Sequence, residues 1–553
     1  MDIKKLVLYC LLAIIGMSLW SAWVKDHPEK NQAAASTQTS NQTELASSSV
    51  PSAFNPASKN TATQTSSENI NHSVNAIQTG KLIHVKTDTI EADISEKGGD
   101  LVSLKLLNYP VSLKSKSPVQ MLSTYSDQLY IVQSGLTGIN NETIEFSSAK
   151  TNDELNNNQK EIQVILNGKT QNGLSVEKIY TFARGQYLVS LKEQVNNNSG
   201  KTWEGSFYTQ IKRQQPPGSS GGFFSVHTYD GAVISSPEKR YDKISYKNMD
   251  ESDLNQNSQD GWIAMQQRYF VGALIPPSQQ ETHYYSNTNQ NIYMIGLVAP
   301  QISLASGESK SFSTRYYLGP KINTLLKAAA PGLDLTIDYG WLWIISDLIF
   351  WLMQKINLLI GNWGWTIVII TILIKIIFYP LSATSYKSMA RMRELQPRIK
   401  ALKERFGDDK KAMGQATMEM YRKEKINPLG GCLPMVIQIP VFIALYYVLL
   451  ESVQLRQAPF VFWIHDLSAK DPYFILPILM GASMFWMQKL TPASPDPSQA
   501  KMMMFLPLIF TVFFATFPAG LVLYWLINNL VSVLQQWYVM KKVSGQTGWK
   551  KTE

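Results

Sequence analysis

The sequence predicts a polytopic α-helical membrane protein that carries a large all-β domain outside the membrane. Three observations point to this fold class. The second half of the 553-residue chain contains a series of apolar runs, and most of them approach the length that crosses a bilayer as a helix. Residues 81–320 instead form short strand-like runs separated by Asn, Gly, Ser and Pro, which is typical of a β-sandwich. Basic residues cluster at the ends of the apolar runs, as membrane-topology signals do.

The composition argues against several other classes of function. The net charge of +9 is distributed as topology signals rather than as one basic surface, so we expect no nucleic-acid specificity. The two cysteines, Cys10 and Cys432, lie in or beside apolar segments, which excludes a disulfide framework. The histidines are scattered, and the sequence contains no GxxxxGK[ST] loop. We therefore expect no metal site, no cofactor and no enzymatic activity.

The first 80 residues are predicted to be an anchor followed by a tether. Lys4 and Lys5 precede an apolar run that ends in bulky tryptophans and lacks a good cleavage site for a signal peptide. Residues 1–25 are therefore interpreted as an uncleaved transmembrane anchor with a cytoplasmic N-terminus. Residues 26–80 contain few large apolar side chains, so we expect a flexible linker.

The β domain, residues 81–320, offers no clustered set of catalytic side chains. Glu91 and Asp93 could be a carboxylate pair, but on an alternating strand such residues usually form a solvated face. A domain of this kind could also bind sugars or peptides, and the sequence indicates no site for either.

Residues 321–362 are predicted to form a linker and an amphipathic helix in the membrane interface. The run 340–360 is apolar, yet one half of its helical wheel is polar. The polar residues are Ser346, Asp347, Gln354, Lys355 and Asn357. If this helix crossed the membrane as well as 363–379, the basic segment 380–427 would lie outside, against the positive-inside rule.

The span at 363–379 contains one charged residue, Lys375, with Thr371 four residues earlier on the same face. Seventeen residues give a helix of roughly 25 Å, the short end for a span. A charge at that depth costs about 2.5–3.5 kcal/mol, so Lys375 should face protein or water. The alternative is that its long stem carries the ammonium to the headgroups beyond Tyr379.

The segment 380–427 has many more basic than acidic residues. Met392, Leu395, Ile399 and Leu402 recur at helical spacing, which predicts an antiparallel helical hairpin in the cytoplasm. Pro397 is expected to kink the first helix or to begin its regular part. The charges are explained either as solvated surface and topology signal or as a docking site for a ribosome or signal-recognition component.

Four further spans are predicted, at 428–450, 473–489, 502–517 and 521–540. They are separated by the outer loop 451–472 and the inner loop 490–501, and the basic tail 541–553 follows. The total is six spans with both termini in the cytoplasm. Polar residues recur within the spans, namely Gln438, Asn528, Asn529, Ser532 and Gln535. Each alone is explained by hydrogen bonding between helices, but together with Lys375 they indicate a hydrophilic pocket.

Long motifs in this region resemble those of the YidC/Oxa-type membrane protein insertases, in the form found in Gram-negative bacteria. They are INPLGGCLPMVIQIPVFIALYYVL at 426–449, LRQAPFVFWIHDLSAKDPYFILPILMG at 455–481, and FPAGLVLYW at 517–525. The β domain agrees through GWIAMQQRYFVGALIP at 261–276.

The resemblance implies a bacterial inner-membrane protein with a periplasmic β-supersandwich and a five-helix insertase core. That core would enclose a groove open to the cytoplasm and to lipid but closed toward the periplasm. One basic residue lies in the groove; it is arginine in most members of the family, and Lys375 stands at the matching position. A lysine keeps the charge but lacks the planar fork that pairs with a carboxylate through two hydrogen bonds.

The function expected from the resemblance is insertion and folding of nascent inner-membrane proteins, alone or with the Sec translocon. The hydrophilic groove would comprise Lys375, Thr371, Gln438, Asn528, Asn529 and Ser532. The apolar surface along which a client helix slides would comprise Cys432, Pro434, Ile439, Phe442 and Phe514. Further expected partners are accessory translocon subunits, lipids, and the ribosome and signal-recognition receptor, which would bind 380–427 and the C-terminal tail. The alternatives are a solute transporter or channel, or a purely accessory chaperone of the translocon.

Overall fold

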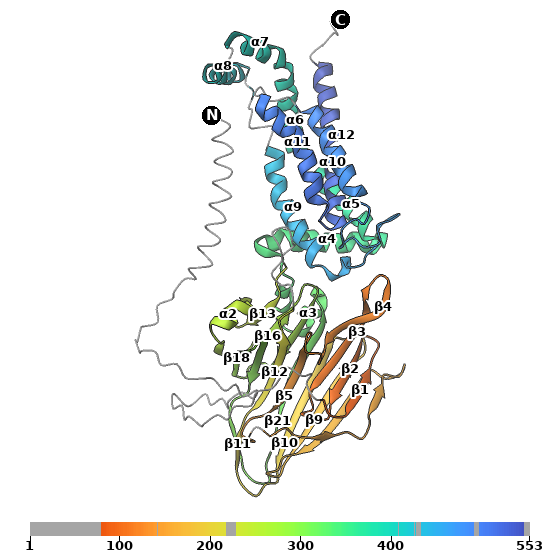
Figure 1. The fold of residues 1–553 in the computed structure, drawn as a ribbon, viewed down its shortest axis with the longest axis vertical. Helices are drawn as coiled ribbons and strands as arrows, with labels where there is room; N and C mark the ends of the chain where they lie inside the picture. Colours follow the sequence, from red (N-terminus) through yellow and green to blue (C-terminus); the bar gives the residue numbers. More distant parts are fainter. Residues whose placement is uncertain are drawn as a thin grey trace, which may run out of the picture.

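The computed structural model describes residues 79–140, 142–216, 228–406, 409–424, 426, 433–491 and 497–546. The predicted anchor at 1–25, nearly all of the linker at 26–80 and residue Cys432 lie outside the described residues. The described chain forms a β domain and a helical bundle placed end to end along the long axis (Figure 1).

The β domain is built on two large, mainly antiparallel sheets. In spatial order, the ten-stranded sheet contains β15 (Asn255–Ser258), β18 (Thr282–Asn289), β19 (Ile292–Val298), β12 (Phe207–Gln214), β5 (Tyr130–Leu136), β3 (Leu101–Ser112), β2 (Ile90–Ser95), β1 (Leu82–Lys86) and β7 (Asn152–Glu154), with β4 (Ser115–Leu122) paired to β3. The nine-stranded sheet contains β14 (Asp242–Ile244), β13 (Gly231–Ser235), β16 (Trp262–Gln266), β17 (Phe270–Ile275), β21 (Ser309–Pro320), β10 (Leu188–Asn197), β9 (Leu174–Ala183), β8 (Glu161–Lys169) and β6 (Phe146–Ser147). A small third sheet pairs β11 (Trp203–Gly205) with β20 (Ile302–Leu304).

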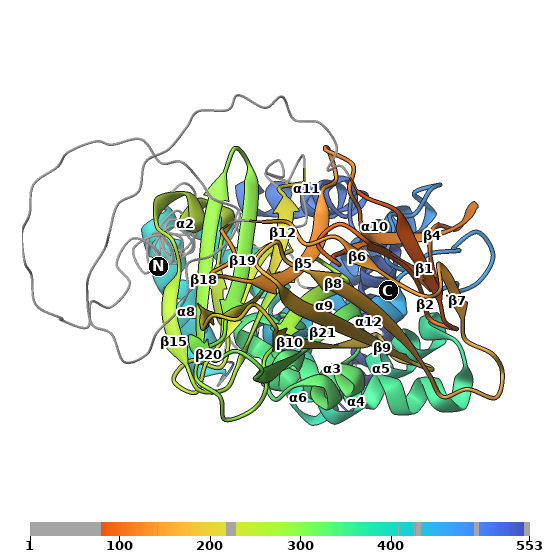
Figure 2. The ribbon, with the colours of Figure 1, turned by 90° about the horizontal axis from the view of Figure 1, so that it is seen from below.

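The hydrophobic core of this domain lies between the two large sheets, which overlap when seen from below (Figure 2). Along β9 every second side chain is buried, as expected for a strand with one face on a core. β16 and β17 are buried at every position. α3 (Asn323–Ala329) and the chain after it are hydrogen-bonded to the nine-stranded sheet. Arg315 donates to the carbonyl of Ala329, and Trp262 donates to the carbonyl of Pro331. The prediction of a large all-β domain is confirmed, with only short helices such as α2 (Tyr246–Glu251) inserted.

The helical part begins after two short 3₁₀ segments, η1 (Leu333–Thr336) and η2 (Gly340–Leu342). Its helices are α4 (Trp343–Ile360), α5 (Trp363–Ile377), α6 (Tyr379–Glu394), α7 (Gln396–Phe406), α8 (Lys410–Lys423), α9 (Leu433–Glu451), α10 (Ile475–Leu490), α11 (Pro497–Phe514) and α12 (Ala519–Gln546), with η4 (Val453–Leu455) after α9. In Figure 1, α9 to α12 run along the long axis, while α4 lies across their end nearest the β domain.

Several helix bounds differ from the predicted spans. α5 ends at Ile377, and after one residue the chain continues into α6 with a bend of 68°. α11 begins at Pro497 and α12 continues to Gln546, beyond the predicted inner ends of their spans. Pro397 lies in the first turn of α7, where its missing N–H breaks no helical hydrogen bond. The proline therefore begins a helix.

By length and hydropathy, one helix among the described residues is able to cross a membrane, the one at Gly340–Ile360. The bent pair of α5 and α6 would be a second if it formed a single span, and the other apolar helices are shorter. Length and hydropathy therefore do not confirm the six predicted spans, and that number stays a prediction. On α4 the exposed side chains are mainly apolar, including Trp343 and Leu359, whereas Ser346 is buried and donates to the carbonyl of Ala444 in α9.

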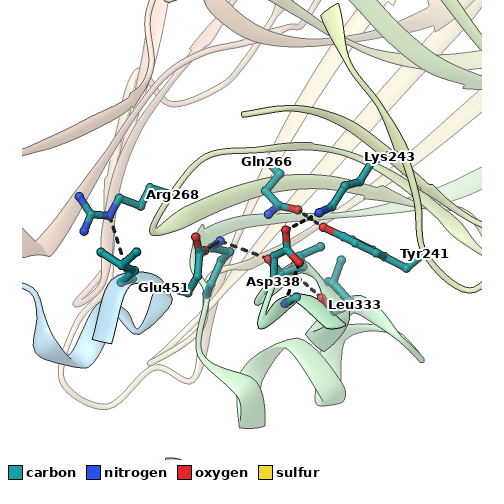
Figure 3. A network of polar contacts seen from close by, with 11 residues as sticks. Tyr241, Lys243, Gln266, Arg268, Leu333, Asp338 and Glu451 are labelled. Carbon is teal, nitrogen blue, oxygen red and sulfur yellow. Dashed lines mark hydrogen bonds and ion pairs between the residues drawn. The ribbon is translucent and has the colours of Figure 1, made fainter. Parts of the chain in front are cut away.

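The β domain is attached to the helical bundle by a polar network at the end of α9 (Figure 3). Lys321, directly after β21, forms an ion pair of 2.6 Å with Glu451, the last residue of α9. Arg268 donates to the carbonyl of Leu450 at 3.1 Å. Close by, Lys243 pairs with Asp338. Since the first two contacts join residues of the β domain to the end of α9, they fix the β domain against that helix.

Candidate functional site

The candidate site is a buried polar cluster between α5 and α12. The ammonium of Lys375 donates to Oγ of Ser532 at 2.7 Å, and the lysine is 2% exposed. The Ser532 hydroxyl donates in turn to the carbonyl of Asn528 at 2.7 Å. Lys375 therefore points between helices, and its ammonium does not reach past Tyr379.

The sequence of α5 explains why Lys375 faces α12. The buried residues Gly364, Ile367, Thr371 and Lys375 recur every three or four positions and form one stripe on the helix. The helix begins at Asn362, whose side chain accepts a hydrogen bond from the N–H of Trp365, a standard N-cap. α5 packs against α12; within this stripe, Ile367 lies beside Gly520 and Lys375 beside Ser532, so the lysine lies in the contact between the two helices.

The partner of Lys375 is a neutral hydroxyl. Within the described part of the chain, its ammonium donates a hydrogen bond to Ser532. The amide of Gln535 donates to the backbone carbonyl of Lys375 at 3.2 Å and ties α12 to the end of α5. A hydroxyl carries no charge that could neutralise an ammonium, so this place favours an anionic or strongly polar group.

The other predicted groove residues are not all brought to Lys375. The Thr371 hydroxyl donates to the carbonyl of Ile367 in its own helix at 2.6 Å. Asn529 lies on another face of α12, where its amide donates to Oγ of Ser483 in α10 at 3.1 Å. Gln438 and Asn528 are both partly exposed. The cluster around Lys375 therefore draws on Ser532 and Gln535, whereas Asn529 joins α12 to α10.

Sequence reasoning missed the contribution of α6 to this cluster. Ser382, Ser385 and Tyr386 are buried on α6, which packs against α12. The Tyr386 hydroxyl lies beside Ser532. The signal was the spacing of these hydroxyl residues on one helix face, but they belong to a segment predicted as a cytoplasmic hairpin. Only the bend after α5 brings them to α12.

The predicted slide residues fall into two environments. Ile439 on α9 is 50% exposed. Phe514 is 3% exposed and packs on Trp525 with ring centroids 5.2 Å apart. Phe442 meets the same tryptophan edge-on at 4.7 Å, so Phe442 and Phe514 belong to one aromatic cluster joining α9, α11 and α12. Cys432 lies outside the described residues, and Pro434 falls within α9.

Exposed apolar side chains are concentrated on α11, next to this aromatic cluster. They are Met502, Met503, Met504, Phe505, Leu506, Leu508, Ile509, Val512 and Phe513. They give α11 an outward apolar surface suited to lipid or to another apolar helix.

The helices α7 and α8 pack together as an antiparallel pair with a small core of their own. Leu395, Ile399 and Ile426 are buried in it, and Met392, Met420 and Tyr421 pack around them. Arg398 pairs with Glu424 at 2.7 Å on the outside. The stripe predicted at Met392, Leu395 and Ile399 thus forms the contact face of the hairpin.

The remaining predictions about chemistry concern metals and carboxylates. Among the described residues, no group of three or more His, Cys, Asp or Glu side chains is arranged to hold a metal ion. Glu91 pairs with Lys105 at 2.6 Å and Asp93 with His84 at 2.7 Å. These two carboxylates therefore belong to cross-strand pairs on the sheet surface.

Comparison with known families divides the chain into two matched regions. Residues 82–352 match the model described as the YidC periplasmic domain, and residues 355–546 match the model described as 60Kd inner membrane protein. The boundary between the matches falls within α4, so the first model covers the β domain and the second covers the helical bundle.

Comparison with individual proteins gives similar sequences over nearly the whole chain. A membrane protein insertase YidC of Coxiella burnetii is 51% identical over 551 residues, covering 98% of this chain and 97% of the relative. One from Legionella pneumophila is 46% identical, covering 100% and 99%. A crystal structure of an active YidC insertase matches 84% of this chain with a TM-score of 0.38 and 19% identity. The sequence relatives support neither a transporter nor a channel, and by their identity and coverage this chain belongs to the YidC family of membrane protein insertases.

Proposed function

We propose that this chain inserts nascent proteins into the bacterial inner membrane and that the cluster around Lys375 is where a polar segment of the client is held. The observation that carries the proposal is the buried ammonium of Lys375 bonded to the neutral hydroxyl of Ser532 at 2.7 Å. The chain acts as an insertase rather than an enzyme, because the client crosses without any covalent change.

The physical role of the lysine is to lower the barrier for a polar or acidic segment. Such a segment loses several kcal/mol of hydration when it enters the bilayer. A carboxylate that displaces Ser532 from the ammonium recovers part of that loss through charge pairing, which is stronger here than in water. Ser532 keeps the hydrogen bond that it donates to the carbonyl of Asn528.

The apolar part of the client would leave along α9 and α11. Ile439 and the exposed face of α11 offer apolar contact, and the methionines at 502–504 can adapt to clients of different shape. Phe442 and Phe514, packed on Trp525, support this surface from beneath. The hydrophilic groove would therefore lie beside a flexible apolar exit, with Gln438 and Asn528 at its edge.

The proposed topology has six spans, both termini in the cytoplasm and the β domain in the periplasm. α4 would lie in the outer interface, since it crosses the end of the bundle (Figure 1) and exposes Trp343 and other apolar side chains. Tryptophan is enriched at that level of a bilayer. The α7–α8 hairpin and the basic tail would meet the ribosome and the signal-recognition receptor, and the Sec translocon would be a further partner.

The test uses the purified full-length chain in liposomes with a small single-span client. Insertion of a client with an acidic extracellular tail should fall in Lys375→Ala and be kept in Lys375→Arg, because the charge rather than the shape of the ammonium is needed. A client whose tail is neutral should depend less on residue 375. Lys192→Ala, an exposed lysine of β10, is the matched control. Equal insertion of the acidic client by wild type and Lys375→Ala would refute the role of the cluster.

A further inference from the structure

The turn between β3 and β4 projects from the β domain toward the helical bundle (Figure 1). At its tip two apolar side chains are in the open, Val111 at 56% exposed and Leu113 at 53%. Two exposed lysines follow, Lys114 and Lys116. Two solvent-facing apolar residues are ordinary on a protein surface, so their position in the molecule decides what they mean.

The position of this turn is fixed by the helical part. The Arg456 guanidinium donates to the carbonyls of Pro110 at 2.7 Å and Val111 at 3.1 Å. Gln457 adds a bond to the Pro110 carbonyl at 3.0 Å. Both side chains come from the segment just after η4, at the end of the bundle nearest the β domain. The backbone of the turn is therefore held while its side chains are left exposed.

Other apolar groups are exposed at the same end of the bundle. Trp341, just before α4, is 74% exposed, and Phe462, in the same connection as Arg456, is 83% exposed. Figures 1 and 2 both place β4 beside this blue connection between α9 and α10. Three separate segments thus expose apolar side chains at the junction between the bundle and the β domain. At the turn, two lysines lie beside these apolar side chains.

We propose that the turn at 110–116 is a membrane contact of the periplasmic domain. Val111 and Leu113 enter the boundary between headgroups and acyl chains of the outer leaflet, and Lys114 and Lys116 bind the phosphates of anionic phospholipids. Apolar tips flanked by lysines suit this boundary, because the tip loses water while the ammonium groups stay with the headgroups. The inference relies on the orientation proposed above, in which the β domain is periplasmic.

The charge arrangement favours a lipid over a protein partner. Lys114 and Lys116 lie beside the apolar tip with no acidic residue between 101 and 126. A cationic tip of this kind is attracted to an anionic lipid surface, and each lysine near such a surface shifts the balance by about fivefold. Reversal of both charges should therefore shift the equilibrium of the tip strongly from the membrane surface toward water.

The test places a spin label at Leu113→Cys in the full-length chain with Cys10→Ser and Cys432→Ser. The control label is at Ser306→Cys, in the turn between β20 and β21, because β20 pairs with β11 at the far end of the domain (Figure 1). Both proteins are reconstituted in vesicles of phosphatidylethanolamine and phosphatidylglycerol. We expect the label at 113 to collide preferentially with oxygen and the label at 306 with a water-soluble nickel complex.

Two changes should move the label at 113 toward water. Lys114→Glu with Lys116→Glu should raise its nickel accessibility, and so should replacement of phosphatidylglycerol by phosphatidylcholine. The thermal midpoint of unfolding should stay unchanged, since these lysines are exposed. A label at 113 that is as accessible to nickel as the label at 306 would overturn the proposal. Protection in native inner-membrane vesicles but not in lipid vesicles would also overturn it, in favour of a protein partner.

The same vesicles separate this inference from the proposed function. Client insertion is measured in each preparation with the labelled chain. Normal insertion together with a label in water would refute the lipid contact alone. Loss of insertion with a lipid-buried label would leave the contact standing and count against the function.

Discussion

The side chains of Lys321 and Glu451 meet at 2.6 Å across the junction between the two parts of the protein, and both are almost completely buried, at 0% and 4% exposed. Lys321 also donates to the carbonyl of Thr336 at 3.2 Å. Lys321 follows β21, a central strand of the nine-stranded sheet, and Glu451 ends α9. The periplasmic sheet is therefore bonded directly to a helix that carries Gln438 and Phe442. The orientation of the domain and the position of α9 are coupled through this pair.

The first prediction concerns this ion pair. Lys321→Met should lower the free energy of unfolding by about 3–5 kcal/mol, because the buried carboxyl of Glu451 loses the ammonium that pairs with it. The double variant Lys321→Met with Glu451→Leu should recover much of the loss, since both charges are gone. Unfolding is followed in detergent by tryptophan fluorescence against denaturant.

The control for that prediction is Lys247→Met. Lys247 pairs with Glu251 on the surface, where the side chains are 84% and 65% exposed, and exposed pairs contribute little. A single variant as stable as the double variant would show that the junction tolerates an unpaired Glu451.

The second prediction concerns Ser532 as the residue that positions Lys375. Ser532→Ala should weaken insertion of the acidic client, but by less than Lys375→Ala, which we expect to cost about five- to thirtyfold for a loss of 1–2 kcal/mol. In the double variant the effect of Ser532→Ala should disappear, because the hydroxyl acts through the ammonium. The measurement is the insertion rate in liposomes for the wild type, both single variants and the double variant. Simple additivity of the two effects would indicate separate roles.

The third prediction separates Asn529 from the cluster. Its amide bonds to Ser483 in α10 at 3.1 Å, so Asn529→Ala should lower stability by about 0.6–1.7 kcal/mol, the scale of hydrogen bonds between membrane helices. Ser483→Ala should have a similar effect, and the two should not add. Insertion of acidic and neutral clients should fall by the same factor. A defect confined to the acidic client would instead assign Asn529 to the groove.

The fourth prediction concerns the close packing of α10 and α11. A Cβ at Gly481 would collide with the Oγ1 of Thr511, whereas a Cβ at Gly414 in α8 would meet nothing within 4 Å. Gly481→Ala should therefore cost about 1–3 kcal/mol. Gly414→Ala should be neutral or stabilising by up to about 1 kcal/mol, since alanine favours a helix. Denaturant unfolding compares the two, and equal effects would contradict the packing argument.

The fifth prediction concerns pH and the core of the periplasmic domain. Glu193 lies 3.4 Å from Lys178, with both side chains 1% exposed. Burial raises the pKa of the Glu193 carboxyl above its ordinary value of 4.5, and Lys178 offsets this only in part. The folded state thus holds the proton more tightly than the unfolded chain. This contribution to stability is fully present below about pH 4.5 and is lost as the pH rises through the raised pKa.

Glu193→Gln resembles the protonated carboxyl at every pH. Its thermal midpoint, compared with that of the wild type, should therefore improve steadily as the pH rises from the acid side toward neutrality. The measurement is a series of melting curves of both proteins across that range. A difference that stays constant, or that changes in the opposite direction, would show that the ionised carboxyl is the form preferred in the core.

Some features of the site depend only on local sequence. The periodicity of α5 puts Thr371 and Lys375 on one face, because side chains four residues apart overlap on any helix. The Met392, Leu395 and Ile399 stripe predicts the α7–α8 contact for the same reason. Alternating burial along β9 and β10 likewise follows from strand geometry. These helix stripes, the strands of the β domain and the family could therefore be predicted from the residues alone.

Other features arise where distant segments meet. The partner of Lys375 is Ser532, 157 residues away, and the bend after α5 decides that Tyr386 joins them. Asn529 and Ser532 are both polar residues of α12, yet they face different helices. Three residues fall about 60° short of a full helical turn, so the two side chains point in different directions and meet different neighbours. No local pattern distinguishes them.

By itself, the sequence determined the family, the all-β class of the first domain, the buried stripe of α5 and the charge within the second predicted span, because these depend on periodicity, composition and local motifs. Only the tertiary structure decided which polar groups surround that charge, that Lys321 pairs with Glu451, and that Arg456 holds the β3–β4 turn at the end of the bundle. The physical reason is that hydrogen bonds and ion pairs act over about 3 Å, and packing alone brings residues so far apart in the chain within that distance.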